Sequence, residues 1–204
     1  MANGKGVIIY PISRGREANF VFFVADPNPW LHNSNTVECS KEEMVADLRG
    51  FDQRLIKLLD WAKPLRWAIH HMRNTPTYFN RRVCLLGDVA HASSPHQAAG
   101  AGQGLEDAVV LTHLLSLVTS VDQVGAAFQA YDAVRRPRAS RVVQTSYEAG
   151  LMYQFQDPNI EDDLQKIVQN ANQRLHWIWN HDLERDIQAA EDMFRSSLST
   201  QITE

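Results

Sequence analysis

The fold is decided by residues 82–108, RVCLLGDVAHASSPHQAAGAGQGLEDA. A short apolar run, Val83–Leu86, is closed by Gly87 and Asp88, and it predicts a β-strand buried on both faces. Ligands of open α/β sheets sit beyond the carboxyl ends of the strands. Asp88 is therefore expected to accept a hydrogen bond from a sugar-like hydroxyl.

The loop after this strand consists of very small residues. Residues 98–104 carry almost no side-chain bulk except at Gln103, so a flat ligand could approach the backbone closely. Helical periodicity begins at Gln103, and a helix N-terminus offers unpaired N–H groups and about half a positive elementary charge. The segment therefore suits a flat ligand with an anionic edge.

The residues before this segment predict a small antiparallel sheet with two short helices. Residues 7–12 and 20–25 are β-branched and aromatic runs that predict a hairpin. Ser40 and Glu43 form a capping-box pattern at the start of a helix, and a second helix is expected over residues 51–62. Residues 66–72 predict another strand.

The residues after it predict helices. Apolar spacing indicates one helix from Gln103 to Val118 and another over residues 121–134. Pro137 is expected to separate that helix from a third one ending near Tyr153, and a long final helix is expected over residues 164–178. The fold class is thus α+β, a small antiparallel sheet followed by a helical C-terminal half.

Composition limits the function classes. The net charge of −4 among 204 residues gives no basic footprint for nucleic acid or an anionic membrane. Neither a signal peptide nor a membrane-spanning run is visible, so a cytoplasmic location is expected. Two cysteines in unrelated contexts give no metal-binding spacing. A small molecule is the expected partner.

The central segment resembles the second FAD-binding signature of flavoprotein monooxygenases of the salicylate hydroxylase type, especially the fungal branch. Tyr10-Pro11 upstream and residues 128–131 and 135–138 downstream follow the order of that family. The resemblance covers roughly residues 6–155. It implies that residues 1–80 are a remnant of the substrate-binding sheet domain and residues 81–204 a remnant of the FAD-binding region plus C-terminal helices.

The resemblance also assigns roles to individual residues. It implies that Asp88 binds the ribityl chain of FAD, that Pro95 shapes the substrate side of the ring, and that Gly100, Ala101, Gly102 and Gln103 line the isoalloxazine. NADPH would be the reductant, and the substrate would be an aromatic or polyketide-derived phenol.

One departure from the family is expected to matter. The family begins with a strand, a Gly-x-Gly-x-x-Gly turn and an acidic residue that hold the dinucleotide, and this sequence shows none of these. Ala98 also stands where relatives usually have Gly. An exposed apolar strand edge would invite association, so a homodimer or a separate FAD-domain chain is the expected partner.

Two histidines are the candidates for acid–base chemistry. His96 lies on the loop that should face the substrate, and His70 could enter the pocket. Two other functions therefore stay open, a cofactor-free cyclase, isomerase or dehydratase that uses these groups, and a noncatalytic binding remnant.

The remaining charged residues receive structural roles. Glu106 and Asp107 are expected to favour the helix dipole, and His91 to pack or hydrogen-bond within the fold. Surface or interdomain ion pairs are expected for Arg135, Arg136 and Arg138.

Overall fold

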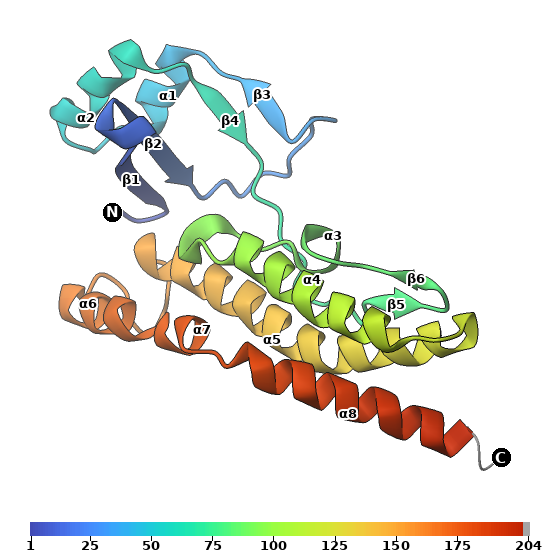
Figure 1. Ribbon diagram of the computed structural model, residues 1–204. Helices are drawn as coiled ribbons and strands as arrows, with labels where there is room; N and C mark the ends of the chain where they lie inside the picture. The colour runs from blue at the N-terminus through green and yellow to red at the C-terminus, as the bar shows by residue number, and fades with distance from the viewer. Residues whose placement is uncertain (202–204) are drawn as a thin grey trace. The chain divides into compact units, whose positions relative to one another are not determined.

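A β-hairpin opens the chain in the computed structural model, which describes residues 1–201 (Figure 1). Strand β1 (Lys5–Ile12) pairs antiparallel with β2 (Glu17–Val24), and the 3₁₀ turn η1 (Ser13–Gly15) joins them. β-Branched and aromatic side chains favour this pleated pairing. The predicted hairpin is confirmed.

Two short helices follow, as the sequence predicts. Helix α1 (Lys41–Asp47) begins with a complete capping box, in which the Ser40 hydroxyl accepts from the Glu43 N–H and the Glu43 carboxylate accepts from the Ser40 N–H. Helix α2 (Gln53–Leu58) continues into η2 (Leu59–Trp61), which confirms the helix expected over residues 51–62.

The strand predicted over residues 66–72 is shorter in the structure. Strand β4 (Leu65–Trp67) pairs antiparallel with β3 (Thr36–Glu38), a partner of only three residues. One further backbone bond follows the pairing, from the Ala68 N–H to the Asn35 carbonyl at 2.9 Å. The Met72 N–H instead donates to the carbonyl of Ala92 at 2.8 Å.

The strand predicted over Val83–Leu86 is also wrong in length and burial. Strand β6 (Val83–Cys84) forms a two-residue antiparallel pair with β5 (Phe79–Asn80). The side chain of Val83 is 67% exposed. A run of apolar residues becomes a doubly covered strand only between neighbouring strands, and β6 pairs with β5 alone among the described residues.

The central segment then forms α3 (Asp88–His91), η3 (Pro95–Gln97) and α4 (Gly100–Leu117). After η4 (Val121–Gln123), helix α5 (Val124–Tyr153) runs through Pro137 without a break, so the predicted division there is wrong. Proline inside a helix costs about 3 kcal/mol. Buried residues on both sides of it, among them Tyr131 and Val142, offset that cost by packing.

The C-terminal helices differ from the prediction. The helix expected over residues 164–178 divides into α6 (Leu164–Gln173) and α7 (His176–Trp179). A further helix, α8 (Leu183–Gln201), was not predicted. Its signal is nevertheless present as apolar residues at helical spacing that pack on the core, namely Leu183, Ile187, Ala190, Phe194 and Leu198.

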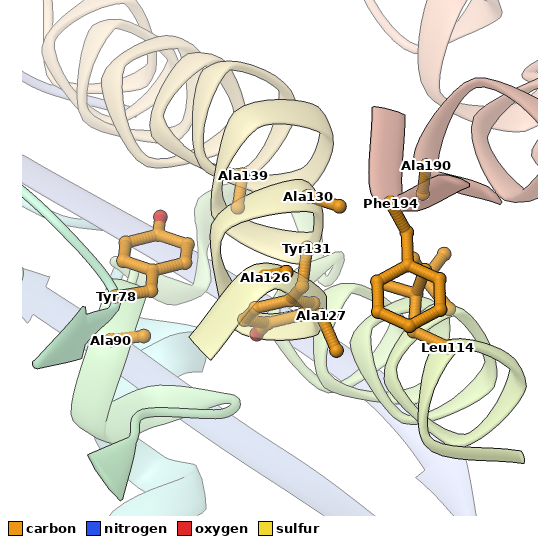
Figure 2. Close-up of a cluster of buried hydrophobic side chains, with 11 residues drawn as sticks. Tyr78, Ala90, Leu114, Ala126, Ala127, Ala130, Tyr131, Ala139, Ala190 and Phe194 are labelled. Atoms are coloured by element: carbon orange, nitrogen blue, oxygen red, sulfur yellow. The ribbon is translucent and has the colours of Figure 1, made fainter. Parts of the chain in front are cut away.

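The principal core joins α4, α5 and α8, which run side by side (Figures 1 and 2). Phe194 of α8 packs near Leu114 of α4, and alanines of α5 allow close helix approach (Figure 2). Tyr78 and Ala90 extend the core toward α3. The core therefore supports the segment that carries the sequence motif.

The chain divides into two compact units. The first comprises Met1–Ile69 with Leu151–Asp163, and the second comprises His70–Gly150 with the chain from Leu164 onward. The first contains the hairpin, and the second contains the motif and the helical core. This confirms an α+β fold of small antiparallel sheets and helices. Assignment of a substrate-binding sheet domain to residues 1–80 and an FAD-binding region to residues 81–204 stays a prediction.

Candidate functional site

Asp88 lies at the start of α3, directly after a turn that only glycine adopts readily. Gly87 is the N-cap of α3 and has a φ of +67°. The side chain of Asp88 is exposed. The turn therefore presents a carboxylate to solvent, where it can accept a hydrogen bond from a ligand hydroxyl.

The turn lies close to α4 because two glycines meet there. A Cβ built at Gly104 would lie 3.5 Å from the Cα of Gly87. Nothing lies within 4 Å of a Cβ built at Gly102, whereas one at Gly100 would lie 2.9 Å from the Ser93 Oγ. The backbones of Gly87 and Gly104 are thus close neighbours, with no side chain between them.

The first turn of α4 presents bare backbone. Ala101 and Gly102 are exposed, and the N-cap residue Ala99 makes no side-chain cap hydrogen bond. The first N–H groups of a helix have no partner within the helix, and they favour negative charge. This surface suits the close approach of a flat ligand, and it lies on the helix that packs against the Asp88 turn.

Gln103 differs from its small neighbours because its side chain turns inward. It is 1% exposed, its Oε1 accepts from Arg135 Nη2 at 3.0 Å, and its Nε2 donates to Glu106 Oε1 at 3.1 Å. Its backbone is occupied too, because the N–H donates to the Ala99 carbonyl at 3.2 Å and the carbonyl accepts from Arg135.

Pro95 and His96 belong to η3. Pro95 is exposed, whereas the His96 ring packs against the backbone of Gly150 on α5. Burial lowers the pKa of His96 from its usual value, so its imidazole is neutral near pH 7. Ala98, the next residue after η3, is left-handed, with a φ of +51°.

His70 is exposed at the start of the second unit, and a pocket role for it stays a prediction. His71 beside it packs on the ring of Tyr147 at 5.3 Å between centroids. The guanidinium of Arg73 lies over the same ring at 4.5 Å. Burial, followed by the charges of Arg73 and His70, lowers the pKa of His71.

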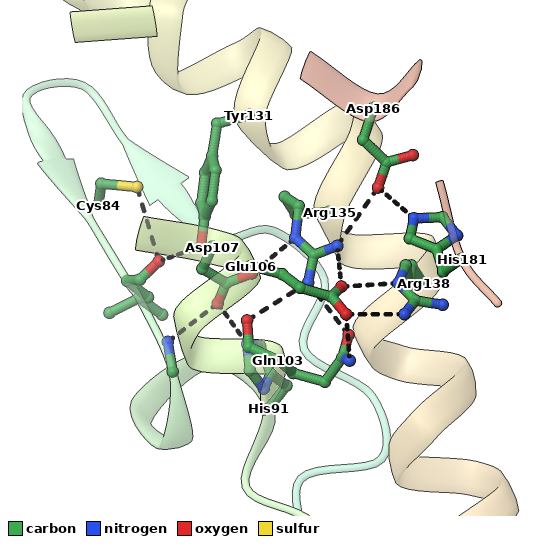
Figure 3. Close-up of polar contacts among 12 residues, drawn as sticks. Cys84, His91, Gln103, Glu106, Asp107, Tyr131, Arg135, Arg138, His181 and Asp186 are labelled. Atoms are coloured by element: carbon green, nitrogen blue, oxygen red, sulfur yellow. Dashed lines mark hydrogen bonds and ion pairs between the residues drawn. The ribbon is translucent and has the colours of Figure 1, made fainter. Parts of the chain in front are cut away.

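Behind the motif lies a buried ion network that connects α3, α4, α5 and α8 (Figure 3). Its centre is the carboxylate of Asp107, which is fully buried. Oδ2 accepts from the Gly87 N–H at 3.1 Å and pairs with His91 Nε2 at 2.5 Å, and Oδ1 accepts from Arg135 Nε at 2.9 Å. The structural role predicted for His91 is confirmed.

The arginine in this network is also fully buried. Nη1 of Arg135 pairs with Glu106 at 2.7 Å and with Asp186 at 3.4 Å, and Nη2 donates to the Gln103 carbonyl at 3.3 Å. A surface or interdomain role for Arg135 was therefore the wrong prediction. Burial of a charge is tolerated here because all parts of the guanidinium meet acceptors.

Arg138 completes the network. It forms a bidentate pair with Glu106, with both N–O distances at 2.7 Å, and donates to the Ile178 carbonyl at 3.3 Å. The guanidinium groups of Arg138 and Arg141 also lie over the ring of Trp177, at 5.6 and 4.1 Å from its centroid. These contacts fix α7 against α5.

The acidic side chains of the network are held in their charged forms. Burial alone would raise the pKa of Asp107, but hydrogen bonds from His91, Arg135 and the Gly87 N–H outweigh it and lower the pKa. Glu106 behaves in the same way, with Arg138 and Arg135 as its partners. Both residues were expected only to favour the helix dipole. Their partners are instead arginines on α5 and, for Asp107, also His91 on α3, which local spacing does not reveal.

Neither a metal cluster nor a membrane-spanning helix is found in the part of the chain that the structure describes. Among residues 1–201 no group of three or more His, Cys, Asp or Glu side chains is arranged to hold a metal ion. None of the described helices combines the length and apolar character that crossing a bilayer requires. The groups that this surface presents are the Asp88 carboxylate and the bare first turn of α4.

Comparison with known proteins gives a consistent result. Residues 1–146 match the FAD binding domain family. An FAD-dependent monooxygenase of Gibberella moniliformis is 40% identical over 209 residues, which cover 96% of this chain and 48% of that protein. A salicylate hydroxylase of Pseudomonas putida is 40% identical over 191 residues, covering 90% of this chain and 44% of that protein.

A solved structure supports the same relationship. A salicylate hydroxylase in complex with substrate matches with a TM-score of 0.86 and 37% identity, covering 93% of this chain and 48% of that one. The chain thus spans about half the length of the relatives it matches.

Proposed function

The chain belongs to the FAD binding domain family, and from this premise we propose that it forms the flavin-contacting half of an FAD-dependent monooxygenase that hydroxylates a small aromatic compound. One observation carries the proposal. The exposed Asp88 carboxylate and the bare first turn of α4 lie on two elements that meet at Gly87 and Gly104.

The residues of this surface fit a flavin. Asp88 would accept hydrogen bonds from ribityl hydroxyls, and the backbone N–H groups of Gly100, Ala101 and Gly102 would face the anionic edge of the ring. The open space at Gly102 leaves room for a flat ring. When bound, FAD would supply the redox chemistry of the hydroxylation, with NADPH as the reductant.

His96 is the proposed proton acceptor for the substrate. A phenol becomes a better nucleophile when it loses its proton, and a neutral imidazole can take that proton. The lowered pKa of His96 keeps the ring neutral near pH 7. Because both ring nitrogens are buried, the proposed role requires the loop that carries His96 to open toward the substrate. His70 is the second candidate, and Pro95 would shape the substrate side of the ring.

The proposed substrate is an aromatic or polyketide-derived phenol. Salicylate hydroxylases are among the relatives at 37–40% identity, and salicylate is a small phenolic acid. The proposal extends this class of compound to the present chain, without choosing among its members.

We also propose that apolar residues on α3 and α4 contact another polypeptide region. Val89 on α3 and Leu105 and Val109 on α4 are 62%, 70% and 46% exposed. Because the matched relatives are about twice as long, the proposed occupant is an FAD-domain segment that corresponds to the half of those proteins that this chain does not span. A homodimer is the alternative. Sedimentation of the 204-residue protein at twice the mass of one chain would indicate the homodimer.

Flavin titration of the 204-residue protein tests the proposal. Binding is followed by the quenching of flavin fluorescence. If this half contacts only the ring and the ribityl chain, riboflavin and FAD should bind with dissociation constants within about threefold of each other, and ADP should not compete with FAD. Asp88→Asn should weaken the binding of both flavins. The matched control is Asp122→Asn, because Asp122 is an exposed acid on η4.

Other outcomes would contradict specific parts. Competition by ADP would place the nucleotide on this chain. Failure of both flavins to bind would refute the flavin-contacting role, and it would leave the cofactor-free enzyme and the noncatalytic remnant as the readings to test. Equal affinity of the Asp88→Asn and wild-type proteins would remove Asp88 from the site.

A further inference from the structure

We propose that Asp107 and Arg135 are positioning residues that fix the Asp88 turn relative to the first turn of α4. This inference rests on the proposed function, because these two elements are the ones proposed to contact the flavin. Neither Asp107 nor Arg135 is exposed, so each would act through its neighbours.

Asp107 holds both ends of the turn. Its Oδ2 accepts from the N–H of Gly87, the residue before Asp88, and pairs with His91, three residues after Asp88. Asp88 lies between these two attachments, and its own side chain is exposed. The position of the exposed Asp88 carboxylate therefore depends on Asp107, which lies 19 positions later in the chain. Asp107 itself is buried.

Arg135 holds the other element. Its Nη2 donates to the backbone carbonyl and to the side chain of Gln103, in the first turn of α4. Its Nε donates to Asp107 at 2.9 Å. The rigid, planar guanidinium of Arg135 thus contacts both Asp107, which holds the Asp88 turn, and Gln103, at the start of α4.

The pairing also explains why a full charge is buried behind the site. A carboxylate in this position needs a counter-charge, and the arginine needs acceptors for its fork. A carboxylate accepts several hydrogen bonds at once, so Asp107 can bind Gly87, His91 and Arg135 together. Asparagine has one acceptor oxygen in its side chain and would lose part of this set.

A charge-neutral double variant, Asp107→Asn with Arg135→Met, tests the role in the complete chain. We measure the riboflavin dissociation constant, the visible circular dichroism of bound riboflavin, and ¹⁵N–¹H amide shifts of Gly87–His91 and Gly100–Gln103. The expected loss of affinity is about tenfold, the scale seen when groups that orient binding residues are removed. Changed dichroism and shifted turn amides should accompany it.

The matched control is Glu191→Gln. Glu191 of α8 pairs with His113 of α4 at 2.7 Å, so this variant also removes a helix–helix ion pair without touching the turn. It should leave the affinity, the dichroism and the turn amides unchanged. Equal losses in the control and the double variant would overturn the proposal, because they would indicate a general effect of stability.

A second variant, Arg135→Lys, tests the same role if the double variant does not fold. Arg135→Lys keeps the positive charge beside Asp107 but lacks the fork that reaches Gln103, and it should shift the Gly100–Gln103 amides and weaken riboflavin binding. Wild-type affinity and amide shifts in either folded variant would overturn the positioning role. If the wild-type chain binds no flavin, the proposed function fails separately, and the amide shifts alone decide whether the pair fixes the turn.

Discussion

The ring of His96 packs directly on the backbone of Gly150, and a Cβ built at Gly150 would lie 2.7 Å from Cε1 of that ring. This contact joins the loop carrying the candidate proton acceptor to α5, and it holds the imidazole in the buried position that lowers its pKa. Glycine at position 150 thus determines where His96 lies.

Gly150→Ala should displace the His96 ring while leaving stability within about 1 kcal/mol, because the gain in helix propensity offsets the crowding. A ring moved toward solvent regains an ordinary pKa. NMR titration of the His96 Cε1 proton measures this rise. Gly125→Ala on the same helix is the control, since nothing lies within 4 Å of its Cβ. Identical His96 titrations in all three proteins would contradict the prediction.

Stability should fall as the pH drops through the titration of His96. Its folded pKa lies below the ordinary value of 6.5, so between those two values the unfolded chain binds more protons and stability rises with pH. The contribution is complete above about pH 6.5 and is lost as the pH falls through the folded pKa. Urea unfolding from pH 5 to 8 measures the slope, which His96→Gln should reduce. An unchanged slope in that variant would assign the effect to other groups, such as His71.

Arg135→Met should destabilise the second unit by about 3–5 kcal/mol, the cost of leaving a buried partner charge uncompensated. Asp107 is the fully buried partner, and Glu106 also loses an ion pair. Urea unfolding followed by circular dichroism measures the loss. Arg54→Met, which breaks the exposed pair with Asp52, should change little. Comparable effects of the two substitutions would show that the buried network contributes no more than a surface pair.

Ala98→Gly should stabilise the protein. The residue has a φ of +51°, and a left-handed conformation costs an L-residue about 1–2 kcal/mol. Glycine removes this cost, but its greater freedom in the unfolded chain offsets about 0.5–1 kcal/mol of the stabilisation. Thermal unfolding should therefore show a higher Tm. Ala99→Gly is the control, because Ala99 has a φ of −108° and should lose stability. A Tm no higher for Ala98→Gly than for Ala99→Gly would rule out strain at residue 98.

The resemblance to flavoprotein monooxygenases was visible in the sequence because its motif is contiguous. Gly87, Asp88 and the small residues up to Gly104 fall within one short segment, and the comparisons confirm the family. The roles assigned to Asp88, Pro95 and Gly100–Gln103 stay predictions. The structure adds that Gln103 is buried and that its side chain turns into the ion network, so the exposed residues Ala101 and Gly102 present the surface of this turn.

The helical face of α4 could not be predicted in the same way. The apolar spacing that predicts this helix includes Leu105, Leu111 and Leu115. Leu105 is nevertheless 70% exposed, and the buried residues of α4 are Gln103, Asp107, Val110 and Leu114. Hydrophobic periodicity assumes that polar groups face water. Here Arg135 satisfies Gln103 and Asp107 inside the protein, so the polar side of the helix can pack inward.

Features that depend on residues close together in the chain could be predicted from it, namely the hairpin, the capping box of α1 and the glycine-rich motif. Their hydrogen bonds and backbone angles are set within a few positions. Tertiary structure alone decided the buried ion network and the continuity of α5 through Pro137. Asp107 and Arg135 are 28 residues apart, and only the packing of α4 on α5 brings together two charges that would each be too costly to bury alone.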